Sequence, residues 1–128
     1  MSIRIVRLGS ARASGEGLRI GTVRRPPRGV PKAQFARQNW YDVWYPELAP
    51  SVETMKIALA AETDAQWSRF VRNYRSEMAA PAPRRTIALL AALSATANFS
   101  VGCYCENEAR CHRSLLKQLL TDAGAQIV

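Results

Sequence analysis

The sequence predicts a single compact α/β domain over residues 1–128, in which a small, mainly parallel β-sheet is flanked by helices. The length of 128 residues suits one domain with its own hydrophobic core. Short β-branched runs alternate with longer segments of helical periodicity, and parallel strands need a crossover that a helix usually supplies. With 48% apolar and 22% charged residues, the composition also excludes wholesale disorder and a fibrous repeat.

Two strands and a basic loop are expected in the N-terminal part. Residues 3–8 and 18–24 are rich in Ile and Val and are separated by a stretch with Ser and Gly, which is typical of two strands. Residues 25–31 contain three prolines, which lack a donor N–H, so this Arg-rich segment is expected to leave the second strand as a loop. The aromatic-rich segment 34–50 has no clean period, and we expect it to pack irregularly over the core.

The remainder of the chain is expected to be mainly helical. Ser51 and Asp64 are the expected caps of two helices, and the second has apolar residues at i, i+3, i+4, i+7 and i+11, which makes one buried stripe. Pro81 and Pro83 are expected to end that helix. In chain order the expected elements are helices 52–60, 64–79 and 84–96, a buried strand over 99–105, a helix over 111–122 and a last short strand over 126–128.

The positive charge is concentrated in the first third of the chain. The formal net charge is +8, from 18 Lys and Arg against 10 Asp and Glu. Residues 1–40 contain nine basic residues and one acidic residue, whereas residues 41–128 contain nine of each. A partner attracted by this charge is therefore expected to meet the N-terminal third. Most of the basic residues are Arg, whose planar fork suits phosphate and carboxylate groups.

All three cysteines and the one histidine of the chain lie between residues 103 and 113. This segment runs from a strand end through a polar loop to a helix start, where unpaired N–H groups and the helix dipole favour an anion. Arg113 in the first turn opposes the dipole unless an anion or carboxylate sits beside it. We therefore predict that Cys111, His112 and Arg113 face a ligand.

Three interpretations of the Cys/His segment remain open. Basic neighbours would favour the thiolate of a reactive cysteine. Three thiols and one imidazole match a Cys3His metal set, but the C-x-C-x5-C-H spacing departs from the usual pairs, and adjacent Cys111 and His112 are expected to diverge on a helix. No metal ligand is therefore assigned. The third interpretation is structural, with Cys103 and Cys105 on one strand face as small buried groups and with His112 as a helix-terminal histidine bonded to a nearby carbonyl.

Several blocks of this sequence together resemble the domain-of-unknown-function family 488, including its YeaO-like branch. The blocks occur in the family's order over most of the chain from about residue 18. They are Pro27-Arg28-Gly29-Val30, Glu47-Leu48-Ala49-Pro50-Ser51, Trp67-Ser68-Arg69-Phe70, Tyr74-Arg75-Ser76-Glu77 and the Cys103 to Leu116 segment.

The resemblance implies a compact α/β domain of mostly bacterial, cytoplasmic proteins with no established reaction. The site residues that it carries over are Arg24, Arg28, Cys105, Cys111, His112 and Arg113. The family pattern often has an acidic residue before the arginine matched to Arg24, and Val23 stands there in this chain.

The sequence thus predicts a small anionic ligand, of the phosphate or nucleotide type, as the partner of a protein that acts as a binding protein or an enzyme. In this hypothesis Arg24, Arg28, Cys105 and Arg113 bind the ligand, and Cys111 and His112 are the catalytic candidates. One alternative is a nucleic-acid-binding module that uses the Arg-rich third. A second alternative is a thiol redox or metal-binding protein.

No cofactor is expected. Membrane association is not expected either, because no stretch approaches the roughly 20 apolar residues of a spanning helix. The clustered, odd number of cysteines favours a reducing cytoplasm over a disulfide framework. A dimer through an apolar helix face is compatible with the sequence.

Overall fold

Four parallel strands form the sheet at the centre of the fold. The computed structural model describes residues 1–105 and 110–128. Within them the sheet order is β1-β4-β2-β3, and every neighbouring pair is parallel. The strands are β1 (Ile3–Arg7), β2 (Leu18–Gly21), β3 (Val43–Trp44) and β4 (Phe99–Cys103). The predicted α/β class with a parallel sheet is therefore confirmed.

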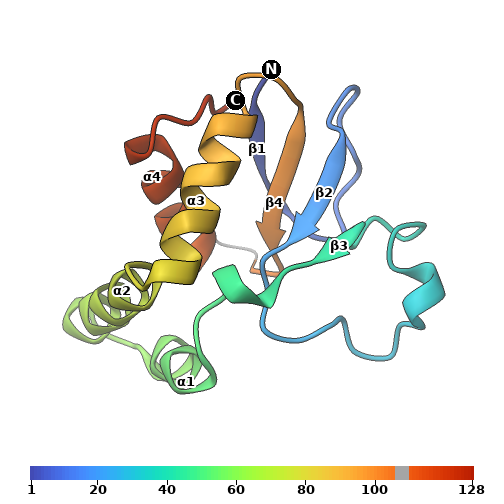
Figure 1. Ribbon diagram of the computed structural model, residues 1–128. Coiled ribbons are helices and arrows are strands. Elements are labelled where there is room, and N and C mark those ends of the chain that lie inside the picture. Colours follow the sequence, from blue (N-terminus) through green and yellow to red (C-terminus); the bar gives the residue numbers. More distant parts are fainter. Residues whose placement is uncertain (106–109) are drawn as a thin grey trace.

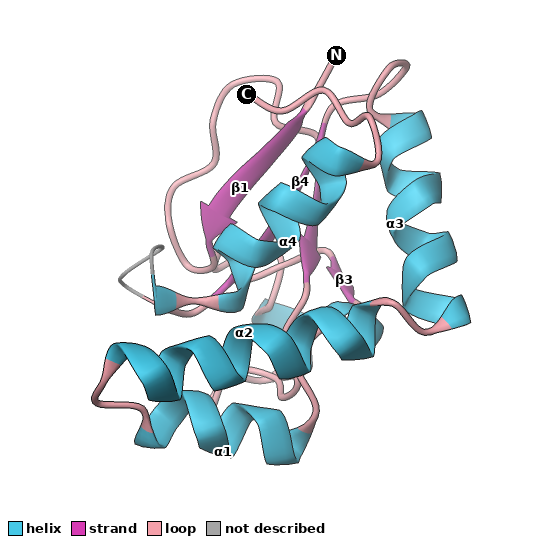
Figure 2. Cartoon of the chain, turned by 90° about the vertical axis from the view of Figure 1, so that its left-hand side faces the viewer, coloured by secondary structure: helices cyan, strands magenta, loops and turns pink. Residues whose placement is uncertain are grey.

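Four helices in the described part of the chain cover this sheet. They are α1 (Val52–Ala60), α2 (Asp64–Met78), α3 (Pro81–Leu93) and α4 (His112–Asp122). Figure 1 shows the helices gathered on one side of the sheet. Figure 2 shows α4 crossing in front of β4, with α2 and α1 beyond the carboxyl ends of the strands. This arrangement brings the first turn of α4 to the edge of the sheet at which the strands end.

The starts of the helices differ in part from the expectation. Ser51 caps α1 as predicted, because its Oγ accepts a hydrogen bond from the Thr54 amide at 3.2 Å. Thr63, not Asp64, caps α2, where it forms a capping box with Gln66. The prediction that helix three starts at residue 84 is wrong, because α3 begins at Pro81. Proline at the first helical position loses no hydrogen bond, since that N–H has no partner within the helix.

The strands also differ in extent. Strand β2 ends at Gly21 and β4 at Cys103, so both are shorter than predicted. The two-residue strand β3 was not predicted, because it lies within the aromatic segment that otherwise is irregular. The last residues do not form a strand of their own, and only an isolated parallel bridge joins Ile127 to Ile3.

The buried apolar residues form two clusters, one in the body of the fold and one near the edge of the sheet where the site lies. The larger cluster packs the helices on the sheet and includes Phe70 and Tyr74 of α2 and Leu116 and Leu120 of α4. The smaller cluster contains buried residues at or after the strand ends, together with residues of the aromatic segment. Its buried members are Leu8, Val23, Tyr41, Cys103 and Cys111. Cys103 and Cys111 of the candidate site are therefore part of a packed layer.

A buried ion pair fixes the loop between β1 and β2. Arg19 and Glu16 are 0% and 3% exposed, and Arg19 Nε lies 2.8 Å from Glu16 Oε2. The Ser100 hydroxyl donates to the same carboxylate at 2.7 Å, and the Ala13 amide donates to Oε1 at 3.1 Å. Arg19 Nη1 donates to the carbonyls of Ser10 and Asn39, each at 2.8 Å. The pair therefore has the full set of hydrogen bonds that buried charges require.

We expect this carboxylate to make the stability of the protein fall in acid. Burial opposes ionisation, but hydrogen bonds from Arg19, Ser100 and Ala13, with the charge of Arg19, lower the pKa of Glu16 from 4.5 to about 2. The contribution of this carboxylate to the free energy of unfolding is complete above pH 4.5 and is lost as the pH falls toward 2, because the unfolded chain takes up the proton first. The shift corresponds to about 3 kcal/mol. Urea unfolding at several pH values between 7 and 2 measures the free energy of unfolding. Its decrease below pH 4.5 should be smaller in Glu16→Gln than in the wild type, and the same pH dependence in both proteins would contradict the assignment.

Candidate functional site

The candidate site lies at the carboxyl edge of the sheet. Thr22 directly follows β2, Cys103 is the last residue of β4, and α4 begins at His112. Strands β2 and β4 are parallel neighbours, so their ends lie side by side. Ligands of open parallel sheets bind at this edge. The fold therefore brings the Cys/His segment to the place where a ligand site is expected.

The imidazole of His112 is held in one orientation by the backbone of β2. Its Nε2 lies 2.6 Å from the carbonyl oxygen of Thr22, so Nε2 carries the hydrogen and donates it. The Thr22 hydroxyl in turn donates to the Gly102 carbonyl at 2.9 Å. Burial lowers the pKa of His112, and the charge of Arg113 acts in the same direction. The ring is therefore neutral near pH 7, with the lone pair of Nδ1 facing the thiol of Cys111 at 3.9 Å.

The three cysteines lie at the end of β4, two residues after it, and at the N-cap of α4. Cys103 and Cys111 are 1% and 2% exposed, whereas Cys105 is exposed. Hydrogen bonding to the thiols of Cys103 and Cys111 lowers the pKa of Cys105, burial raises it, and the charge of Arg113 lowers it further. Hydrogen bonding to Cys105 and Cys111, together with burial, raises the pKa of Cys103. The cluster therefore has two buried thiols and one that is open to solvent.

Arg113 is the second residue of α4 and is buried with its charge. The residue is 5% exposed, and its Nε has no hydrogen-bond partner among residues 1–105 and 110–128. No acidic residue stands in the first turn of α4. A buried N–H donor without a hydrogen-bond partner is unfavourable, and the position of the guanidinium at the positive end of the helix dipole adds to this.

Four of the six predicted site residues come together: Cys105, Cys111, His112 and Arg113. Arg24 is directed elsewhere, because its Nε and Nη2 donate to the carbonyls of Pro50 and Ala49 at 3.0 and 3.1 Å. This contact ties the loop after β2 to the segment before α1. Arg28 is exposed in the basic loop. The described contacts therefore do not form the three-arginine clamp that the sequence predicted.

The expectation that Cys111 and His112 diverge is wrong. Cys111 is not inside the helix but is its N-cap, with φ −138° and ψ 151°. This extended backbone turns the thiol toward the imidazole of the next residue. Sγ of Cys111, Sγ of Cys103 and a ring nitrogen of His112 lie within 4.8 Å of one another.

The structural alternative for His112, a hydrogen bond to a nearby carbonyl at the start of its helix, is confirmed, and the acceptor is Thr22. The sequence could not show which carbonyl it is, because a backbone acceptor has no signature there. Sequence reasoning missed Tyr74, whose ring centroid lies 5.6 Å from that of His112. Tyr74 was predicted as part of the buried stripe of its helix, and the heptad-like spacing gives no information about which ring it meets.

Comparison with protein families identifies the chain. The family model DUF488-N3a, described as the active DUF488-N3 subclade, matches residues 3–124. The chain belongs to the DUF488 family. The match is compatible with the YeaO-like branch but does not assign it. Comparisons with curated proteins and with solved structures gave no match. Within the described residues of this DUF488 domain, no helix is long and apolar enough to cross a membrane.

Part of the basic surplus of this DUF488 domain is used inside the fold. Arg19 forms the buried pair with Glu16, and Arg12 binds Asp42 through Nη1 at 2.8 Å and Nη2 at 3.0 Å. Arg24 binds backbone carbonyls. The nucleic-acid alternative depends on a continuous surface of positive charge. Arginines that are engaged in these contacts contribute less to such a surface. That alternative stays a prediction.

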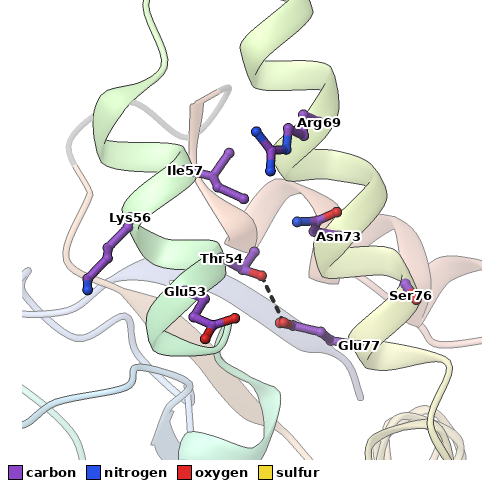
Figure 3. Close-up of a pocket in the computed structure, with 8 residues that line it drawn as sticks. All are labelled: Glu53, Thr54, Lys56, Ile57, Arg69, Asn73, Ser76 and Glu77. Atoms are coloured by element: carbon purple, nitrogen blue, oxygen red, sulfur yellow. Dashed lines mark hydrogen bonds between the residues drawn. The ribbon is translucent and has the colours of Figure 1, made fainter.

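A cavity of about 470 Å³ lies elsewhere, between α1 and α2 of the DUF488 domain. Figure 3 shows the side chains of α1 and α2 that line it, with Thr54 donating a hydrogen bond to Glu77. The Glu77 carboxylate also accepts from the Ser51 amide and hydroxyl, so it holds the start of α1. The cavity shares no lining residue with the Cys/His segment, and its one anchored carboxylate is engaged in the fold. We therefore place the candidate site at the carboxyl edge of the sheet.

Proposed function

We propose that this protein binds a small anion of the phosphate type, such as the phosphate group of a nucleotide, at the N-terminus of α4. One observation carries the proposal: the side chain of Arg113 is buried there with an unpartnered Nε among the described residues. A bound phosphate would supply an acceptor for this Nε and a negative charge beside the guanidinium.

The start of α4 provides the remaining requirements of an anion site. The first N–H groups of a helix have no partner within the helix, and the dipole favours negative charge in front of them. The side chain of the N-cap Cys111 makes no cap hydrogen bond of the usual kind, and the first turn holds no carboxylate. Arg binds phosphate through two parallel hydrogen bonds, which gives orientation as well as affinity.

A reaction at this site is a narrower hypothesis than ligand binding. The description of the matched subclade contains the word active and names no reaction. Cys111 and His112 stay the predicted reacting groups, because their thiol and imidazole adjoin the proposed anion site. The substrate and the type of reaction are not part of the proposal.

We expect inorganic phosphate to stabilise the wild-type protein against heat and to have no such effect on Arg113→Ala. At ten times the dissociation constant a ligand adds about 1.4 kcal/mol, which raises the melting temperature by about 5 °C for a domain of this size. Differential scanning fluorimetry on chelator-treated protein, with chloride at matched ionic strength as reference, measures the shift. Arg85→Ala removes an exposed arginine of α3 and is the matched control, which should keep the full shift.

A second variant separates ligand binding from a purely structural role. Without phosphate, Arg113→Met should be at least as stable as the wild type, because it replaces a buried charge, whose Nε has no partner among the described residues, by an apolar side chain of similar length. A wild-type protein that phosphate does not stabilise, or an equal phosphate shift in Arg113→Ala, would contradict the proposal. A strongly destabilised Arg113→Met would show that the guanidinium serves the fold.

A further inference from the structure

The donor atoms at the junction of β4 and α4 are arranged around a common point. Sγ of Cys103, Sγ of Cys111 and a ring nitrogen of His112 lie within 4.8 Å of one another, and all three residues are buried. In a tetrahedral zinc site with Zn–S of about 2.3 Å and Zn–N of about 2.0 Å, neighbouring donors are about 3.5 to 3.8 Å apart. The distance of 3.9 Å between Cys111 Sγ and His112 Nδ1 is close to this value.

The orientation of the imidazole is a second, independent observation. The hydrogen bond from Nε2 to the Thr22 carbonyl fixes the tautomer in which Nδ1 has the free lone pair. Metal-binding histidines are commonly held in this way, with one ring nitrogen donating to a carbonyl while the other binds the ion. The Thr22 carbonyl is itself fixed in the sheet, since Thr22 donates to Gly102 through both its amide and its hydroxyl.

The donor set has three members, drawn from the end of β4 and the start of α4: two thiols and one imidazole. Three protein ligands leave the fourth position of a tetrahedral ion open to water or another ligand. The exposed Cys105 is not a member of this set.

We propose that Cys103, Cys111 and Nδ1 of His112 bind a divalent ion of the zinc type, with the fourth position open to a solvent molecule. Thiolate and imidazole donors select zinc and similar soft or borderline ions over magnesium and calcium. Each thiol gives up its proton to solvent when the ion binds, and no change of oxidation state is involved. The site goes beyond the anion proposal, because it uses different atoms and is tested without phosphate.

The test is a titration of untagged, reduced and metal-free protein with Co²⁺, followed by displacement with Zn²⁺. The wild type should bind one Co²⁺ with the visible d–d bands of tetrahedral coordination and with thiolate-to-cobalt charge-transfer absorption, and Zn²⁺ should abolish both. His112→Ala and Cys111→Ser should bind about 100-fold more weakly or not at all. Cys105→Ser, the matched thiol control outside the donor set, should keep both the d–d bands and the charge-transfer absorption. Unchanged binding by Cys111→Ser would overturn the proposal.

X-ray absorption of the zinc-loaded wild type keeps the proposal testable if the variants fail to fold. A first shell of sulfur at about 2.3 Å with one nitrogen supports it, and a shell of oxygen and nitrogen alone overturns it. Absence of both cobalt and zinc binding at micromolar concentration also overturns it. The phosphate shift of the metal-free protein is unaffected by these outcomes, so failure of the metal site and failure of the anion site are distinguishable.

Discussion

Glu16→Gln is expected to destabilise the protein by about 3 to 5 kcal/mol, because it leaves the Arg19 guanidinium buried without its counter-charge. Arg19 is fully buried, and Glu16 supplies two of its hydrogen bonds, at 2.8 and 3.0 Å. A typical domain has only about 5 to 15 kcal/mol of total stability, so the loss is a large share of it. Urea unfolding followed by tryptophan fluorescence at pH 7 measures the effect.

A double-mutant cycle separates the ion pair from general damage to the loop. Arg19→Met should also be destabilising, because the carbonyls of Ser10 and Asn39 lose a donor. The double variant with Glu16→Gln should be more stable than the sum of the single losses predicts, since neither charge is then left alone. Asp64→Asn breaks an exposed pair with Arg110 and is the matched control, with no measurable effect expected. If the double variant loses as much stability as the two single variants together, Glu16 and Arg19 are not coupled and the prediction is contradicted.

The predictable part of the fold is the part with a clear period. Residues 64–78 form α2 because the apolar stripe of Trp67, Phe70, Tyr74 and Met78 has helical spacing, and β4 follows from a short buried run. Strand β3 could not be predicted, because two residues have no period and Val43 and Trp44 are both exposed. Its place depends on pairing with β2, which is a tertiary effect.

The candidate site was predictable in its residues and not in its geometry. The grouping of Cys103, Cys105, Cys111 and His112 in one segment is visible in the sequence, and four of the six predicted residues meet. The relative direction of Cys111 and His112 depends on whether the helix begins one residue earlier or later. Sequence patterns locate helix starts to within a few residues, so they could not determine that Cys111 is the N-cap.

The predicted role of the basic third was too general for a similar reason. The charge count treats all arginines of residues 1–40 alike, whereas Arg12, Arg19 and Arg24 each have partners within the fold. The arginine whose buried Nε has no partner among the described residues is Arg113, in the part of the chain with no net charge. The charge count alone therefore could not single out the arginine on which the proposed anion site depends.

Tyr74→Ala is expected to destabilise the protein by about 3 to 5 kcal/mol, because it removes a buried aromatic side chain and leaves a cavity. Tyr74 is 0% exposed and lies where α2 meets α4, with its ring 6.1 Å from that of Phe70 and 5.6 Å from that of His112. Its hydroxyl also donates to the Leu48 carbonyl at 2.8 Å. Chemical unfolding at pH 7 measures the loss.

The conservative variant Tyr74→Phe separates the ring from the hydroxyl. It keeps the packing and leaves the Leu48 carbonyl unpaired, so its loss should be smaller, about 1 to 3 kcal/mol. Leu89→Ala on the exposed face of α3 is the matched control and should change the stability by less than about 0.5 kcal/mol. Equal losses for Tyr74→Phe and Tyr74→Ala would show that the hydrogen bond, not the packing against Phe70 and His112, holds α2 at the site.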